Sequence, residues 1–420
     1  MVSRSSIALS LIWLAVLASP GVAQDAGWPR WRGPAGDGAW EPKDLPANLS
    51  QTTPKQLWST QVGGGYSGVT AADGRVFLMD LDTQASDSPK ERVLCFDAKT
   101  GQQIWNHSWP VDYGKMEYGD GPRSSVTVDG ARCYALGARG QITCLAVADG
   151  KRLWAADAVS DFGAKPPQWG FAASPLIDGD HVLLHVGAAN SGSVIALDKT
   201  TGKEVWRGGP DPAGYCTPEI IQHAGARQLI AWGPAHVQSI DAASGRTLWT
   251  YPYKITYGVS IAQPLYRDRL LLVSGYWHGT KVLKLGKTPD EVSLLWENEK
   301  EMCGLMSAPL YKDGTVFLLD KNHGLQALRL ETGELLWRDE NTLTPAGRNP
   351  QMSLVWMRQS EGLAALLNAS GELVYVRLSD TGAEELVRHQ VIGKTWSHPA
   401  FVGPTLFARS NTELVAWQLW

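Results

Sequence analysis

Residues 195–206 read IALDKTTGKEVW, and residues 239–249 repeat the same order of residue types as SIDAASGRTLW. Each stretch has an apolar run, then an aspartate, a glycine four residues later and a tryptophan four residues after that. The apolar run is typical of a strand, and the aspartate and glycine are typical of a tight turn into a second strand. The two stretches therefore predict one structural unit that occurs more than once in the chain.

The glycine-to-tryptophan spacing recurs along most of the chain. We count eight copies, 41 to 52 residues apart, although the copies at Trp58 and Trp296 lack the glycine and the last has leucine in place of tryptophan. This period is typical of the four-stranded blades of a β-propeller. We interpret the repeated aspartates as turn residues and the tryptophans as packing between adjacent sheets. The residues at the tryptophan position are Trp58, Trp105, Trp154, Trp206, Trp249, Trp296, Trp337 and Leu386.

The end of the chain supplies too few strands for a complete last copy. Residues 398–402, 406–409 and 414–418 predict three strands, and the early segment 55–62 matches the missing fourth. Pairing the first strand with the last would remove an exposed sheet edge. The sequence therefore predicts an all-β fold over residues 54–420, an eight-bladed β-propeller of four-stranded antiparallel blades whose last blade is closed by the N-terminal strand.

The first residues have the order of a secretory signal peptide. The basic Arg4 precedes an apolar stretch at residues 7–18, and small residues follow up to Ala23. An uncleaved membrane anchor is the alternative, but the apolar stretch is short for a membrane span. We therefore expect a signal peptide at residues 1–23, an irregular arm at residues 24–53, and an exported chain, periplasmic or secreted, with no membrane span after cleavage.

Charge and motifs argue against several functional classes. The 420-residue chain has a formal net charge of −4, which argues against a nucleic-acid partner. No Ser-His-Asp order, HExxH motif or glycine-rich phosphate loop occurs, so hydrolase and nucleotide-binding functions have no residues to support them. We therefore assign no catalytic residue and no metal ligand, and we expect a monomer.

The five cysteines leave one structural question open. None is adjacent to another and no CxxC spacing occurs, so zinc and c-type haem sites have no support. Cys133 and Cys144 flank a predicted hairpin turn at residues 137–140. If that turn is a two-residue loop, the two cysteines lie opposite each other and a disulfide is possible. The alternative is two small buried apolar side chains.

The pattern of an apolar strand, Asp-x-x-Thr-Gly and Trp at residues 195–206 resembles the PQQ-like propeller repeat. The resemblance extends over residues 54–420. Such repeats occur in quinoprotein alcohol dehydrogenases, in the outer-membrane assembly lipoprotein BamB and in many secreted proteins without an assigned role. The arm residues 27–38, GWPRWRGPAGDG, also resemble the segment that precedes the propeller in secreted bacterial members of this group.

The resemblance implies two alternative functions. Members that oxidise alcohols bind PQQ with calcium, use an aspartate base and have a disulfide of adjacent cysteines. This chain has no Cys-Cys pair and lacks the length of those enzymes, and it has no lipoprotein cysteine after Ala23. Our first hypothesis is an exported non-catalytic propeller without a cofactor, a binding or scaffold module for an envelope protein or a small ligand. The alternative is a PQQ- and calcium-dependent oxidoreductase acting on an alcohol or a sugar.

Propellers bind at the ends of the central channel, where loops enter the first strand of each blade. In this sequence aromatic residues and arginines gather just before the predicted first strands. Such side chains could hold a peptide, a sugar or a planar ligand; alternatively, the rings only fill the axis. The predicted ligand-binding residues are Tyr66, Arg123, Trp169, Tyr215, Tyr257, Arg348, Trp396 and His398.

Overall fold

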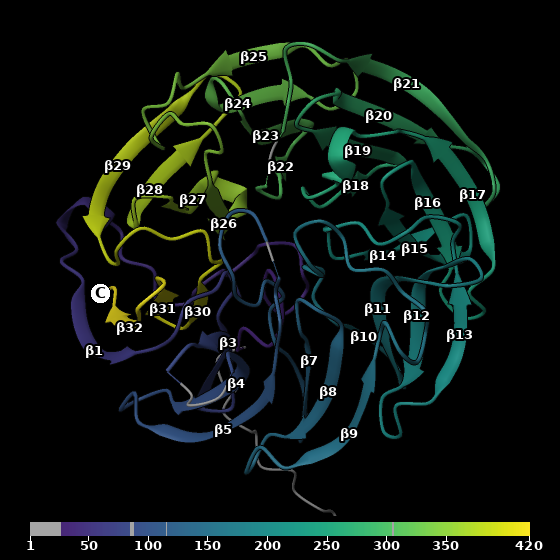
Figure 1. Cartoon of the computed structure of the whole chain (residues 1–420). Helices are drawn as coiled ribbons and strands as arrows, with labels where there is room; N and C mark the ends of the chain where they lie inside the picture. Colours follow the sequence, from purple (N-terminus) through teal and green to yellow (C-terminus); the bar gives the residue numbers. More distant parts are fainter. Residues whose placement is uncertain (1–26, 85–87, 115, 305) are drawn as a thin grey trace, which may run out of the picture.

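The computed structural model describes residues 27–84, 88–114, 116–304 and 306–420. Eight four-stranded antiparallel sheets form a ring of blades (Figure 1). This confirms the predicted eight-bladed β-propeller, whereas the predicted signal peptide lies outside the described residues. Within the described part of the chain, no helix has the length and apolar character needed to cross a membrane.

Each blade runs from an innermost strand near the axis to an outermost strand at the rim (Figure 1). Blades 1 to 4 consist of β2 (Thr70–Ala72), β3 (Arg75–Asp82), β4 (Lys90–Asp97), β5 (Gln103–Pro110); β6 (Thr127–Asp129), β7 (Arg132–Leu136), β8 (Gln141–Ala146), β9 (Arg152–Asp157); β10 (Leu176–Asp178), β11 (His181–Ala188), β12 (Gly192–Asp198), β13 (Glu204–Gly208); and β14 (Glu219–His223), β15 (Ala226–Trp232), β16 (His236–Asp241), β17 (Thr247–Pro252). Blades 5 to 8 consist of β18 (Leu265–Arg267), β19 (Leu270–Gly275), β20 (Gly279–Leu285), β21 (Val292–Asn298); β22 (Leu310–Lys312), β23 (Thr315–Asp320), β24 (Gly324–Arg329), β25 (Leu335–Arg338); β26 (Met352–Arg358), β27 (Leu363–Asn368), β28 (Glu372–Leu378), β29 (Ala383–Gln390); and β30 (Ala400–Val402), β31 (Thr405–Arg409), β32 (Glu413–Gln418), β1 (Lys55–Gln61). Three single-turn 3₁₀ helices complete the described structure: η1 (Leu49–Gln51), η2 (Thr256–Gly258) and η3 (Gln359–Glu361).

The repeated aspartate closes the turn before the outermost strand. In blade 3, Asp198 Oδ1 accepts hydrogen bonds from the backbone N–H of Thr201 (2.7 Å) and from its hydroxyl (2.8 Å). These hydrogen bonds hold the pKa of Asp198 below its usual value. Gly202 follows with φ of +73°, a conformation that favours glycine. The carboxylates of Asp97 and Asp241 accept the same kind of turn hydrogen bonds, in agreement with the structural role predicted for them.

The repeated tryptophan packs against the next blade. Trp154 of blade 2 donates its indole N–H to the carbonyl oxygen of Lys199 in blade 3 (3.1 Å). Its ring also lies on Gly202, where an added Cβ would approach the ring to 2.7 Å. The glycine of one repeat therefore makes room for the tryptophan of the preceding repeat. The same ring-on-glycine contact joins Trp58 to Gly101, Trp105 to Gly150, Trp206 to Gly245 and Trp296 to Gly333.

The N-terminal strand completes blade 8, as the sequence predicts. β1 pairs antiparallel with β32, from Lys55 opposite Gln418 to Gln61 opposite Glu413. Trp58 of β1 also donates its indole N–H to the carbonyl oxygen of Ala98 in blade 1 (3.0 Å). β1 is thus the outermost strand of the last blade, and it contacts the first blade together with β30 and β31 of the same sheet.

The predicted opposition of Cys133 and Cys144 is wrong. Cys133 pairs with Leu145 and Cys144 with Tyr134, because the hairpin turn is one residue longer than the predicted two-residue loop. A shift of one residue turns a side chain to the other face of the sheet. Cys133 consequently lies in the core between blades 1 and 2, and Cys144 in the core between blades 2 and 3. All five cysteines are free and buried.

Candidate functional site

The arm that precedes the propeller, residues 27–41, crosses one end of the central channel. Trp28 exchanges two backbone hydrogen bonds with Ala71 in the innermost strand of blade 1 (2.6 and 2.9 Å). Gly38 accepts a backbone hydrogen bond from Trp356 in the innermost strand of blade 7 (2.7 Å). Because the innermost strands surround the axis, an arm joined to several of them covers the channel at that end.

Arg32 fastens the arm to two further blades. It is 4% exposed, and its guanidinium donates to Gln263 Oε1 before β18 (3.3 Å) and to the carbonyl oxygen of Pro309 before β22 (3.2 Å). A third hydrogen bond reaches the carbonyl oxygen of Asp37 within the arm (2.8 Å). Burial lowers the pKa of Arg32 to about 10, so the side chain keeps its charge at neutral pH. Separating this buried charge from its oxygen partners would cost free energy, because the guanidinium would be left buried and unpaired. These contacts therefore hold the arm in place.

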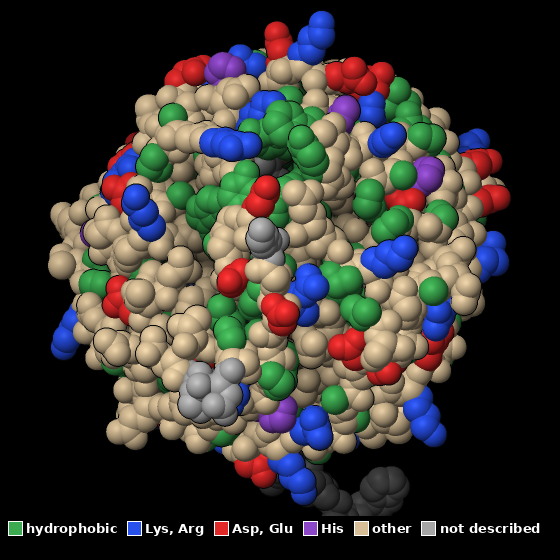
Figure 2. All heavy atoms as spheres, viewed as in Figure 1, with side chains coloured by type: hydrophobic (Ala, Val, Ile, Leu, Met, Phe, Trp, Pro, Cys, Tyr) green, Lys and Arg blue, Asp and Glu red, His purple; other side chains and the backbone are tan. Residues whose placement is uncertain are grey.

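A cavity of about 430 Å³ lies at the other end of the channel. The loops that enter the innermost strands form its wall, and Trp31 of the arm closes its floor. Hydrophobic side chains gather around the centre of this face, with a few charged ones among them (Figure 2). The cavity is therefore a blind pocket, open on one face of the ring. Seven of the eight predicted ligand-binding residues line it: Tyr66, Arg123, Trp169, Tyr215, Tyr257, Arg348 and Trp396.

His398 lies outside the lining of this cavity. It is 7% exposed, its ring centroid is 4.8 Å from that of Trp31, and its Nδ1 is 2.9 Å from the carbonyl oxygen of Pro399. Burial lowers its pKa to about 4, so the imidazole is neutral at physiological pH. His398 thus packs against the ring of Trp31, whereas the other seven predicted residues surround the open space.

Nine aromatic, acidic and amide residues that line the cavity were not predicted from the sequence. Most of them stand in loops outside the repeat, where no periodic pattern marks them. One signal was available, since Tyr276 and Trp277 are adjacent aromatic residues in a hairpin turn, a place where polar residues are usual. Lys321 holds this pair, with its Nζ 4.6 Å from the centroid of Tyr276 and 5.2 Å from that of Trp277. The nine residues are Trp31, Glu117, Tyr118, Gln168, Gln263, Tyr276, Trp277, Asn349 and Gln351.

Tyrosine hydroxyls tie the loops of the cavity together. Each of three hydroxyls bonds to the backbone of another loop, so the rings are held in fixed orientations. A binding site ordered in this way loses less conformational entropy when a ligand enters. The Tyr66 hydroxyl donates to the carbonyl oxygen of Tyr118, the Tyr276 hydroxyl donates to that of Arg348 (3.2 Å), and the Tyr215 hydroxyl accepts from the backbone N–H of Trp169 (3.2 Å).

Arg123 donates hydrogen bonds to the backbone of its own loop. Its guanidinium donates to the carbonyl oxygens of Gly121 and Gly119, the latter at 2.9 Å. It also lies 5.2 Å from the centroid of the Tyr66 ring, a cation–π contact. Burial lowers the pKa of Arg123. The residue therefore orders the loop before blade 2.

His185 supports the loop that carries Tyr215. Its Nε2 accepts the backbone N–H of Gly214 (3.2 Å), and its Nδ1 lies 3.2 Å from the carbonyl oxygen of Cys216. These contacts fit a neutral imidazole with its proton on Nδ1, because a proton on Nε2 would point at the Gly214 N–H. Burial lowers the pKa of His185 to about 4.

We expect the free energy of unfolding to fall as the pH is lowered from 6.5 to 4. A histidine whose pKa is 6.5 unfolded and about 4 folded takes up its proton first in the unfolded chain. The stabilisation is complete above pH 6.5, decreases between these values, and amounts to about 3 kcal/mol for each of His185 and His398. Burial raises the pKa of Glu219 to about 7, so this residue stabilises the fold more as the pH is lowered from 7 to 4.5. This gain offsets part of the loss from the two histidines.

Urea unfolding across this pH range checks the prediction. The variant His185→Gln keeps a donor and an acceptor but has no titratable group, so its stability should depend less steeply on pH than that of the wild type. Equal pH dependence of the two proteins would show that His185 does not contribute.

Calcium-bound PQQ fits the residues of this cavity poorly. Calcium takes about six to eight oxygen ligands, usually with several carboxylates, whereas Glu117 is the only acidic residue in the described lining and is exposed. Across the described residues, no group of three or more His, Cys, Asp or Glu side chains is placed to hold a metal ion. The five free cysteines also provide no disulfide to pack on the quinone. The donor set thus favours a ligand that needs no metal.

Comparison with known proteins identifies a family and similar structures. The family described as outer membrane protein assembly factor BamB matches residues 43–110, 89–254 and 233–419. The outer membrane protein assembly factor BamB of Yersinia pestis is 22% identical over 316 residues, which is 71% of this chain and 74% of that protein.

Two solved structures share the fold. BamB from Moraxella catarrhalis has a TM-score of 0.59 at 17% identity, and the match covers 87% of this chain and 98% of the BamB chain. Quinohemoprotein alcohol dehydrogenase from Comamonas testosteroni has a TM-score of 0.69 at 13% identity, and the match covers 95% of this chain and 81% of the dehydrogenase chain. At these identities the likeness concerns the fold alone. The family match, by contrast, extends over most of the sequence, and the chain belongs to the BamB family of PQQ-like propellers.

Proposed function

We propose that this chain is an exported, non-catalytic propeller that binds a ligand in the blind cavity and acts as a binding or scaffold module of the cell envelope. The observation that carries the proposal is the convergence of seven predicted residues on one cavity, which Trp31 closes from below. Its volume of about 430 Å³ is within the range of small-molecule sites. A small ligand, or one chain end or loop of an envelope protein, is therefore a suitable occupant.

The proposed location and partners draw support from the family. The curated relative is named an outer membrane protein assembly factor, so an envelope protein is a reasonable partner for this chain. The predicted signal peptide supports export to the periplasm or beyond. One chain closes the entire ring by itself, and we expect it to act as a monomer.

Capture from an envelope extract tests the proposal. Wild-type protein is compared with the cavity variant Tyr215→Ala/Trp396→Ala and with Leu57→Ala/Leu153→Ala, which changes two exposed apolar residues of outermost strands. Retained proteins and small molecules are identified by mass spectrometry. We expect at least one species to fall about tenfold or more in the cavity variant and to be unchanged in the outer-strand variant. Equal retention by all three proteins would contradict the proposal.

The oxidoreductase alternative has a separate test. Purified protein is mixed with PQQ and calcium, passed over a desalting column and assayed for dye-linked oxidation of alcohols and sugars. We expect neither retained quinone absorbance nor substrate oxidation, because the lining lacks the carboxylates that calcium requires. Stoichiometric quinone retention together with substrate oxidation would establish the alternative.

A further inference from the structure

We infer that the ligand of the blind cavity is a neutral carbohydrate, bound as the end of a short oligosaccharide. This inference rests on the proposed binding function and assigns it a chemical class. A sugar ring has two properties that a site must match: hydroxyl groups around its edge, which both donate and accept hydrogen bonds, and C–H groups that form an apolar face. The described lining has counterparts for both.

The most buried polar groups of the lining are uncharged. Gln263 is 7% exposed, Gln351 8% and Ser174 2%. Of the three charged lining residues, Glu117 and Arg348 are exposed at the mouth, and the half-buried Arg123 donates to backbone carbonyl oxygens of its own loop. Burial of an ionic group is costly without a charged partner, so the interior of the cavity is suited to a ligand without charge.

Two buried polar atoms of the lining residues have no hydrogen-bond partner within the described structure. One is an acceptor, Gln351 Oε1, and the other is a donor, the indole N–H of Trp169. Both atoms have almost no accessible surface as the cavity stands, so a ligand reaches them only after the side chains of Gln351 and Trp169 turn. A hydroxyl group can then serve both, because it donates one hydrogen bond and accepts others. A carboxylate can only accept and an ammonium group can only donate, so neither matches the pair.

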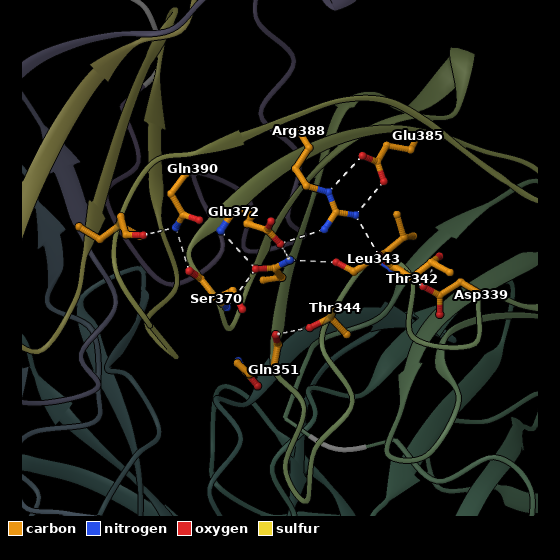
Figure 3. A network of polar contacts seen from close by, with 12 residues as sticks. Asp339, Thr342, Leu343, Thr344, Gln351, Ser370, Glu372, Glu385, Arg388 and Gln390 are labelled. Carbon is orange, nitrogen blue, oxygen red and sulfur yellow. Dashed lines mark hydrogen bonds and ion pairs between the residues drawn. The ribbon is translucent and has the colours of Figure 1, made fainter.

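A framework of polar contacts holds Gln351 in place. Its backbone carbonyl accepts a hydrogen bond from Thr344 Oγ1 (3.3 Å), within the loop that joins β25 to β26. Arg388 of β29 donates to the carbonyl oxygen of Thr342 in that loop (2.9 Å) and forms a two-pronged ion pair with Glu385 (3.1 and 2.7 Å). Figure 3 shows these contacts side by side. The amide of Gln351 therefore projects from a loop that is braced against blade 7.

The aromatic side chains supply platforms for the apolar face of a sugar. Tyrosine and tryptophan offer large, rigid surfaces with little conformational entropy to lose, and the hydroxyl ties described above fix several of them. Pairs of neighbouring rings recur around the cavity: Tyr66 with Trp396 (centroids 5.9 Å apart), Trp169 with Tyr215 (5.8 Å), and Tyr276 with Trp277 (4.2 Å).

Two tyrosines at the mouth are held in an unfavourable backbone conformation. Tyr118 has φ of +65° and Tyr257 has φ of +56°, in the left-handed region that bulky side chains rarely adopt. Such strain is costly and is found mainly where a side chain must be placed for binding. Both rings are exposed, Tyr118 at 43% and Tyr257 at 65%, and they extend the aromatic surface outward, where a second sugar unit would lie.

A proline-rich peptide is the main competitor, because extended proline segments also bind aromatic grooves. Proline has no backbone N–H, so such a segment would offer carbonyl oxygens to the donor of Trp169 but nothing to the acceptor of Gln351. Once these two side chains turn, a carbohydrate can satisfy both atoms and the proline segment only one, so the carbohydrate is the better match.

Binding to four neutral oligosaccharides tests the inference: cellotetraose, maltotetraose, laminaritetraose and chitotetraose. Purified protein is titrated with each by calorimetry and by tryptophan fluorescence. We expect at least one to bind saturably, with an affinity that stays within about twofold between 0.05 and 0.5 M salt, because an uncharged ligand gains nothing from unscreened charges. Gln351→Leu and Trp31→Ala should each weaken it about tenfold or more, whereas Gln103→Leu, at an exposed position of β5, should not.

The outcomes separate this inference from the proposed function. Absence of saturable binding by all four sugars, or binding unaffected by both cavity variants, would overturn the carbohydrate assignment. Tighter binding of a proline decapeptide than of any sugar would overturn it in favour of a peptide. If the sugars fail but extract capture still depends on Tyr215 and Trp396, the cavity remains a binding site for another class of ligand. If both experiments fail, the binding function itself is wrong.

Discussion

Replacing residues 55–61 with a Gly-Ser linker of the same length is expected to abolish cooperative folding of the whole propeller. The change removes the hydrogen bonds between β1 and β32 and leaves β32 as an exposed sheet edge. It also removes Trp58, which makes one of the contacts between blade 8 and blade 1. A domain is stable by only about 5 to 15 kcal/mol, so losing one strand and one interblade contact together should suffice. Circular dichroism during thermal unfolding measures the effect.

A rescue variant provides the control. Lys55 lies opposite Gln418 near the end of the chain, so a copy of residues 54–62 joined after Trp420 by a short hairpin loop can reach the same edge. We expect this addition to restore a cooperative transition to the linker variant. A linker variant that unfolds as cooperatively as the wild type would show that β1 is dispensable.

Trp154→Ala is expected to lower the free energy of unfolding by about 3 to 5 kcal/mol, as is usual for a large aromatic residue removed from a core. Trp154 is 9% exposed and fills the space left by Gly202 in the next blade. Trp154→Phe keeps most of the packing and loses the hydrogen bond to Lys199, so about 1 kcal/mol should be lost. Urea unfolding of each variant gives the values.

The neighbouring residue is a matched control for this series. Leu153 is 46% exposed on the same strand, and Leu153→Ala should change stability by no more than about 0.5 kcal/mol. Equal losses for Trp154→Ala and Leu153→Ala would mean that the tryptophan contact does not hold the blades together.

The blades could be predicted because their signals are local. The aspartate, the glycine and the tryptophan of a repeat stand within a few residues of one another, so one turn and one interblade contact recur wherever the pattern does. The pairing of Cys133 and Cys144 could not be predicted as well. It depends on the length of one turn, and a difference of a single residue places the two thiols on opposite faces.

The candidate site was predictable in part for the same reason. Tyr66, Tyr215 and Trp396 stand at equivalent places before their blades, so the ring symmetry brings them together. Trp31 has no such position, because it reaches the cavity by a path across the channel and contacts Gln263, which is 232 residues away in the sequence. No local pattern encodes that path, which depends on the tertiary contacts of the arm.

The pairing of β1 with β32 has a consequence for biogenesis. Ser59 and its hydrogen-bonding partner Glu413 are 354 residues apart, so a ribosome makes β1 long before its neighbour β32. Domains usually begin to fold as the chain emerges. Here β1, with Leu57 and Trp58, has no strand to pair with until β32 has been made. That segment is therefore a natural client for chaperones, and the propeller can close only after β32 has been made.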